Sequence, residues 1–127
     1  MFAERFLPLI NSFPNDADAL RRVANYFEDL ENRQGERVFK VRLHANRLFD
    51  ISQAGSTYRL ARLIQILLDA NLLERRLIVR SPLGGGVEYR SHEAIPSVVL
   101  DPLRDVEMDV TEENLEASYV VVANGSN

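Results

Sequence analysis

The stretch LLDANLLERR, from Leu67 to Arg76, constrains the fold more than any other part of the chain because two periodicities meet at one asparagine. Upstream of Asn71, apolar residues recur at helical spacing, and downstream, apolar and charged residues alternate as in a strand. Asparagine readily adopts the left-handed conformation that ends many helices. The sequence therefore predicts a helix over residues 57–70 that ends at Asn71 and passes directly into a strand.

The predicted helix has two different faces, and Ser56 is a suitable cap for its first turn. With about 100° of rotation per residue, its expected buried face carries Leu60, Leu63, Ile64 and Leu67. The opposite face carries Tyr58, Arg62, Gln65 and Asp69, with Arg59 at its edge. Ile66 falls between Arg59 and Arg62, which indicates that a partner protein or the chain's own tail covers this face.

Two alternating segments follow the helix. ERRLIVRS and VEYRS read as short strands, and the glycine-rich PLGGG between them reads as a loop. This arrangement predicts a β-hairpin.

The first residues, FAERFLPLINSF, place Phe2, Phe6, Ile10 and Phe13 at helical spacing. Proline is tolerated only in the first turn of a helix, so Pro8 limits where a helix can begin. We expect a short helix or an arm here. Its aromatic side chains either cover the core of the domain or contact a partner, such as a second copy of the chain.

PNDADALRRVANYFEDLENRQG predicts a longer helix, with Asn15 as its cap and Gly35 as its stop. Its expected buried stripe contains Ala17, Leu20, Val23, Ala24, Phe27 and Leu30. Three shorter elements are then expected: a strand at RVFKV, a helix at RLHANRLFDI that packs through Leu43, Leu48 and Phe49, and a tight turn at SQAGS.

The last third of the chain is acidic and rich in strand-forming pieces. SVVL, VEMDV and SYVVV surround a turn or short helix near TEENLEA. The whole pattern predicts an α+β chain in three segments: an N-terminal helix or arm (1–14), a central domain (15–94) and an acidic C-terminal segment (95–127).

Charge is distributed unevenly along the chain, whose net charge is −4. Residues 1–36 carry a net charge of −3, and residues 91–127 carry −7. Residues 37–90 contain ten basic and four acidic residues, a net charge of +6. A basic centre between acidic flanks favours an acidic partner such as nucleic acid.

Other functional classes find little support in the sequence. The chain has no cysteine, and its two histidines, His44 and His92, have no spaced partners for a metal site. Asp105, Glu107 and Asp109 alternate on one face of a possible strand, which an amphipathic edge strand explains without a metal. PLGGG opens no helix and lacks the lysine of a phosphate-binding loop. We expect a non-enzymatic cytoplasmic protein without a cofactor, a membrane segment or a small-molecule substrate.

The element order, together with RLFDIS, STYRLARLIQILLDANLLERR and SPLGGGVEYR, resembles the winged helix-turn-helix superfamily over a third to a half of the chain. The resemblance implies duplex DNA binding, with the third helix in the major groove and the wing on the backbone. Arg59 and Arg62 would then read guanine edges. The other implied DNA contacts are Ser56, Thr57 and Tyr58 at the start of the helix and Arg76, Arg80 and Arg90 on the wing.

The resemblance also allows a second function, because winged helices serve as small protein-binding subunits beside the ATPases of SMC-type complexes. The chain's size and acidity are similar to those of the small middle components of bacterial anti-phage systems that carry an SMC-like ATPase. Ile66, and Asp69 on the same face, fit a protein-covered surface better than a DNA-reading one. In this alternative, Phe2, Phe6 and Ile66 contact the partner, and a homodimer is one option.

Overall fold

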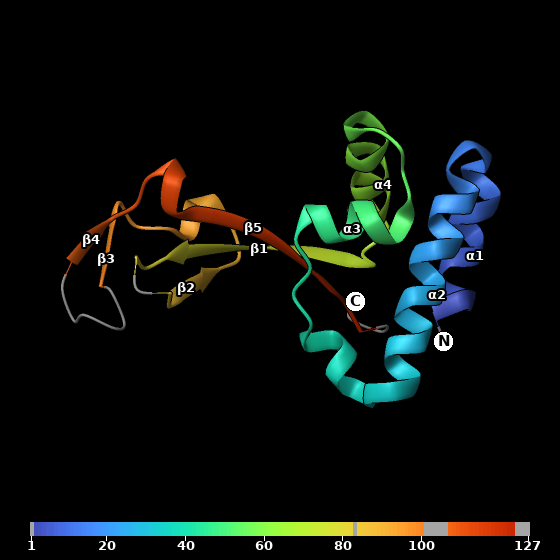
Figure 1. The fold of residues 1–127 in the computed structure, drawn as a ribbon, viewed down its shortest axis with the longest axis horizontal. Helices are drawn as coiled ribbons and strands as arrows, with labels where there is room; N and C mark the ends of the chain where they lie inside the picture. Colours follow the sequence, from blue (N-terminus) through green and yellow to red (C-terminus); the bar gives the residue numbers. More distant parts are fainter. Residues whose placement is uncertain (1, 83, 101–106, 124–127) are drawn as a thin grey trace. The chain divides into compact units, whose positions relative to one another are not determined.

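The computed structural model describes residues 2–82, 84–100 and 107–123. It shows an α+β chain in which N-terminal helices precede a region of antiparallel strands (Figure 1). The chain divides into two compact units. The helical unit comprises Met1–Glu74 with Val120–Asn127, and the strand unit comprises Arg75–Tyr119. None of the described helices is long and apolar enough to cross a bilayer.

Helix α1 (Phe2–Ser12) begins six residues before Pro8, so the expectation that Pro8 must lie in a first turn is wrong. Side-chain contacts explain how the early start is held. The carboxylate of Glu28 accepts hydrogen bonds from the backbone N–H groups of Phe2 (2.8 Å) and Ala3 (3.2 Å). Phe2 and Phe6 are fully buried, and the Phe2 ring lies 5.6 Å from that of Phe27 on α2. These contacts of the first turn offset the free-energy cost of the backbone hydrogen bond that Pro8 cannot donate.

A 3₁₀ turn, η1 (Pro14–Asp16), leads into helix α2 (Ala17–Gln34). The helix follows Asp16, not the predicted cap Asn15, and ends at Gly35 as expected, with a φ of 61°. The buried stripe contains five of the six predicted residues: Leu20, Val23, Ala24, Phe27 and Leu30. Ala17, in the first turn, is half-buried.

The segment RVFKV forms a 3₁₀ helix, η2 (Gly35–Lys40), so the predicted strand is wrong. Within η2 only Val38 is buried, and a single inward residue gives no strand-like alternation. Helix α3 (Ala45–Ser52) is present as expected and buries Leu48. The predicted tight turn follows, with Gly55 at a φ of 88°.

Helix α4 (Thr57–Asp69) confirms the prediction on which the fold depends. The Ser56 hydroxyl accepts a hydrogen bond from the backbone N–H of Arg59, as a helix cap does. Asn71 has a φ of 57° and ends the helical run. All four residues of the predicted buried face are buried, and Ile66 is buried with them.

The predicted hairpin is formed by β1 (Leu73–Arg80) and β2 (Gly86–Tyr89), which pair antiparallel with Ile78 opposite Glu88. Strand β5 (Leu115–Val121) joins β1 on its other edge, so the sheet order is β2-β1-β5. A second sheet pairs β3 (Val98–Leu100) with β4 (Glu107–Asp109). Short 3₁₀ turns, η3 (His92–Ala94) and η4 (Glu112–Asn114), connect these strands.

The tail prediction is therefore confirmed for the described residues: SVVL, VEMDV from Glu107 and SYVVV each contribute to a strand. Val79, Val99 and Met108 form the core of the strand unit. Glu107 and Asp109 are exposed on either side of buried Met108, as an amphipathic strand requires. Asp105, the third acidic residue of that predicted face, lies outside the described residues.

A candidate partner-binding groove on the helical unit

The exposed start of α4 carries three of the predicted DNA-contacting residues. Ser56, Thr57 and Tyr58 are exposed, and 72% of the surface of Tyr58 is accessible. The Ser56 side chain already caps the helix. Thr57 and Tyr58 are accessible to a ligand at this end, and Tyr58 also interacts with Arg62.

The two arginines predicted to read bases are attached to the chain's own η1 turn. Arg62 Nε lies 2.8 Å from an Asp16 carboxylate oxygen, and the Asp16 side chain is only 3% exposed. Arg59 donates a longer hydrogen bond of 3.4 Å to the Asn15 carbonyl. The hydrogen bond with Asp16, its negative charge and Tyr58 raise the pKa of Arg62, so this guanidinium stays charged. Its positive charge is compensated within the fold.

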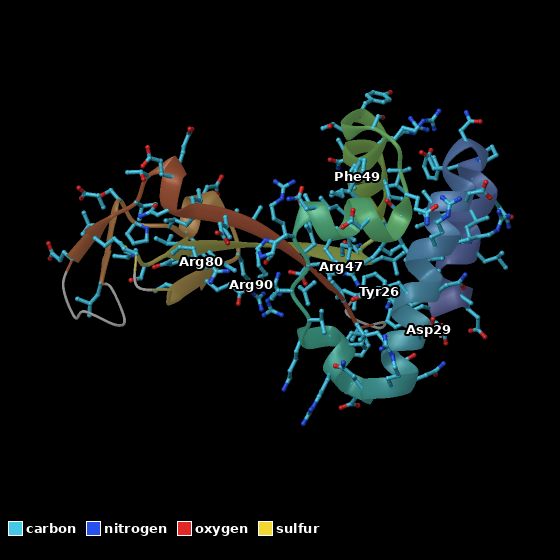
Figure 2. All side chains as sticks on the ribbon, in the orientation of Figure 1. Tyr26, Asp29, Arg47, Phe49, Arg80 and Arg90 are labelled. Atoms are coloured by element: carbon cyan, nitrogen blue, oxygen red, sulfur yellow. The ribbon has the colours of Figure 1, made fainter. Side chains whose placement is uncertain are left out.

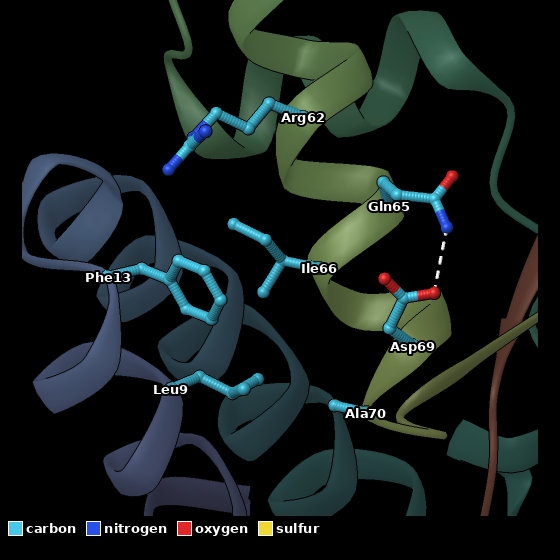
Figure 3. Close-up of a pocket in the computed structure, with 7 residues that line it drawn as sticks. All are labelled: Leu9, Phe13, Arg62, Gln65, Ile66, Asp69 and Ala70. Atoms are coloured by element: carbon cyan, nitrogen blue, oxygen red, sulfur yellow. Dashed lines mark hydrogen bonds between the residues drawn. The ribbon is translucent and has the colours of Figure 1, made fainter.

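Beyond Arg62, the outward face of α4 forms one wall of a groove whose opposite wall comes from α1 and Phe13. The groove has a volume of about 410 Å³. It is lined by Leu9, Phe13, Arg62, Gln65, Ile66, Asp69 and Ala70. Figure 3 shows Leu9 and Phe13 facing Ile66, with Gln65 and Asp69 on the other flank. We call this feature the α1–α4 groove.

The α1–α4 groove explains the apolar residue on the polar face of the helix. Ile66 is 7% exposed and lines the groove opposite Leu9 and Phe13. The sequence indicated that a partner or the chain's own tail covers this face; in the fold, the segment that faces Ile66 across the groove is the chain's own N-terminal one. Gln65 donates a hydrogen bond of 2.8 Å to Asp69, which fixes the far flank of the groove (Figure 3).

Arg5 holds α1 against the end of α4. Its guanidinium donates hydrogen bonds to the carbonyls of Val122 (2.7 Å) and Asn71 (3.5 Å). The backbone N–H of Val122 in turn bonds to the Leu72 carbonyl at 2.9 Å. Partial burial lowers the pKa of Arg5, but a guanidinium remains charged at neutral pH. The walls of the groove are thus fixed to one another without a partner.

Phe2 and Phe6, predicted as partner contacts under the adaptor alternative, have no accessible surface in the folded chain. They pack in the core of the helical unit, where Phe2 also lies 6.1 Å from Phe39. Of the two roles that the sequence allowed for these aromatic residues, covering the core is therefore the one that the fold shows for Phe2 and Phe6. Leu7, between them in the sequence, is 54% exposed.

The predicted wing arginines differ in their surroundings. The Arg76 side chain is 14% exposed and lies 3.9 Å from Glu88, and Arg80 pairs with Glu116 at 2.9 Å. Arg90 is exposed at the end of the hairpin (Figure 2). Of the three side chains, that of Arg90 is the most accessible to a ligand.

Other arginines of the basic sequence segment also have internal contacts. Arg47 lies over the ring of Tyr26 at 5.5 Å (Figure 2). Arg42 donates to the Lys40 carbonyl at 3.0 Å. Within residues 2–82, 84–100 and 107–123, no three His, Asp or Glu side chains come together as a metal site would require.

Comparisons identify no relative of this chain: no protein family, no curated protein and no solved structure matches it. The assignment of a function therefore depends on the site itself. Sequence reasoning missed Leu9 as a groove residue and Asp16 as an ion-pair partner. The available signals were the Leu9–Phe13 spacing, one helical turn, and the apolar Ile66 in a polar face.

Proposed function

We propose that this chain is a non-enzymatic protein-interaction adaptor, a winged helix-turn-helix subunit of a larger complex that binds its partner through the α1–α4 groove. Helices α2, α3 and α4 followed by the β1–β2 hairpin have the element order of that superfamily. The apolar groove supplies the concave surface that such an adaptor needs.

One observation carries the proposal: the face of α4 that would enter DNA is in contact with the chain's own N-terminal segment. A groove-reading helix needs its polar face free to reach base edges. Here Arg62 is paired with Asp16, Ile66 faces Leu9 and Phe13 across the groove, and Asp69 puts a negative charge where phosphates would approach.

The division of charge between the units agrees with this proposal. The helical unit contains ten basic and ten acidic residues, so its net charge is zero. The strand unit, with five basic and nine acidic residues, carries −4. The electrostatic attraction that supplies most non-specific DNA affinity is therefore weak.

Duplex DNA binding is the second candidate function, and one observation favours it. Tyr58 and Arg59 are exposed at the start of α4, and Arg90 is exposed on the hairpin. Each unit therefore offers exposed side chains that could contact phosphates.

Fluorescence anisotropy with a labelled random-sequence duplex separates the two candidates. For the adaptor we expect a dissociation constant weaker than about 100 µM at physiological salt, the weak limit of ordinary non-specific binding. The control variant Arg59→Ala/Arg90→Ala should behave like the wild type. Micromolar binding that weakens with salt and with this double substitution would overturn the proposal in favour of DNA.

Co-purification from the native cells tests the adaptor directly. We compare Ala70→Arg, which puts a long side chain into the α1–α4 groove, with Ala61→Arg, which adds the same side chain to exposed α4 surface outside it. Quantitative mass spectrometry should show a partner retained by the wild type and Ala61→Arg and lost from Ala70→Arg. Equal retention by both variants counts against the groove as the binding surface.

A further inference from the structure

We infer that the α1–α4 groove accepts one amphipathic α-helix from the partner protein, with apolar residues at positions i, i+4 and i+7, an acidic residue near Arg62 and a basic residue near Asp69. This inference rests on the proposed adaptor function and specifies the chemistry of its partner. The lining residues of the groove indicate the length, backbone conformation and charge of the bound segment.

The length of the groove fits about two helical turns. It follows α4 from Arg62 to Ala70, which at 1.5 Å per residue is about 12 Å. Apolar residues at i, i+4 and i+7 of a bound helix span about the same distance on one face. Leu9, Phe13 and Ile66 supply the apolar surface that such side chains would cover (Figure 3).

The walls of the groove favour a helix over an extended peptide. Both walls are formed mainly by helices, whose backbone N–H and C=O groups bond within each helix. An extended segment buried here would find few backbone partners for its own polar groups. A helix satisfies those groups internally and presents only side chains to the groove.

Charges at the two ends of the groove indicate an orientation. The Arg62 side chain lines the groove and is 44% exposed beside its ion pair with Asp16, so an acidic residue of the partner could approach it from the groove. Asp69 is exposed on the flank nearer the other end, where Gln65 holds its carboxylate in place. Residues 62 and 69 are seven positions apart. A helix with an acidic residue seven positions before a basic one, lying parallel to α4, complements both.

The same order of charges suits the bound helix itself. An acidic residue near its N-terminus and a basic residue near its C-terminus both interact favourably with its macrodipole. The ion pairs would lie at the rim of the interface, where they contribute more to orientation and specificity than to affinity. The apolar anchors supply most of the affinity.

The experiment is a selection of helical peptides against the full-length chain. A phage library that displays a helical scaffold randomised along one face is selected on the immobilised protein, and the leading peptide is synthesised and labelled. We expect enriched clones with apolar residues at i, i+4 and i+7 and the acid-to-base order described above. Ala70→Arg should weaken binding of the leading peptide at least about tenfold, whereas Ala61→Arg leaves it unchanged.

Charge reversal tests the orientation. Asp69→Lys should weaken the leading peptide about two- to fivefold, as expected for an exposed ion pair. Changing the basic residue of the peptide to glutamate should restore the affinity. Circular dichroism of each variant confirms that it remains folded, since residues 61, 69 and 70 are all exposed.

Three outcomes would overturn this inference: enrichment of non-helical sequences, leading peptides that are insensitive to Ala70→Arg, or a groove that binds only small apolar compounds. Each of these leaves the adaptor function standing if a partner still co-purifies. The adaptor function is overturned by a different measurement, namely micromolar binding of duplex DNA in the anisotropy experiment. The two failures are therefore distinguishable.

Discussion

The ion pair between Arg62 and Asp16 changes how the polar face of α4 is interpreted. On a helical wheel Arg62 lies on a polar face and looks available to a ligand. In the fold it neutralises a carboxylate that is almost completely buried. Sequence alone could not show this, because the two residues are 46 positions apart and Asp16 looks like an ordinary residue near a helix start.

The pair predicts an unequal response to substitution. Asp16→Ala removes the acceptor but leaves Arg62 able to reach water, so we expect a loss of about 1 kcal/mol in the free energy of unfolding. Arg62→Ala should destabilise more, since it leaves the Asp16 carboxylate buried without a partner. Urea denaturation monitored by circular dichroism provides the measurement.

The double variant Asp16→Ala/Arg62→Ala is the control for this argument. It should be more stable than Arg62→Ala alone, because removing the buried carboxylate relieves the uncompensated charge. Additive losses would show that the two side chains do not depend on each other.

At the scale of elements, α1 is the part that sequence reasoning described least well. Its aromatic spacing was visible, but Pro8 limited the predicted start, and the residues that anchor it, Glu28 and Phe27, belong to another helix. By contrast, α4 and the hairpin follow from local signals: Ser56, Asn71 and the change from helical to alternating spacing. The predicted strand at RVFKV failed because its residues do not share a buried face.

The role of α1 can be tested with adjacent residues. Phe6→Ala should reduce the free energy of unfolding by about 3 kcal/mol, because it removes a fully buried aromatic side chain. Leu7→Ala, at a position 54% exposed, should change it by less than about 0.5 kcal/mol. Thermal and urea denaturation measure both. A stable Phe6→Ala variant would mean that α1 is an arm and not a wall of the fold.

At the scale of the whole molecule, the charge segments visible in the sequence do not coincide with the two folded units. The +6 segment, residues 37–90, is divided between the helical unit, whose net charge is zero, and the strand unit, which carries −4. The net charge of this sequence segment favoured a nucleic-acid partner, whereas the net charges of the two folded units do not. This difference depends on long-range contacts, which no local pattern encodes.

The C-terminal segment belongs to the fold for the same reason. Val120 and Val121 are buried and belong to the helical unit, although they follow the acidic part of the sequence. Val121→Ala should lower the free energy of unfolding by about 2 kcal/mol. Val98→Ala, at a position 39% exposed, should have a much smaller effect, and equal effects of the two in chemical denaturation would contradict this account.

The hydrogen bond from Arg5 to Val122 joins residues 117 positions apart. During synthesis the four α-helices leave the ribosome first, but the strand end that completes their unit is translated after all of residues 75–119. The helical unit therefore reaches its final state only after the residues up to Val122 have emerged. Until then the main-chain acceptor at Leu72 that pairs with Val122 is open, and a nascent chain paused in this interval would be a natural client for a chaperone.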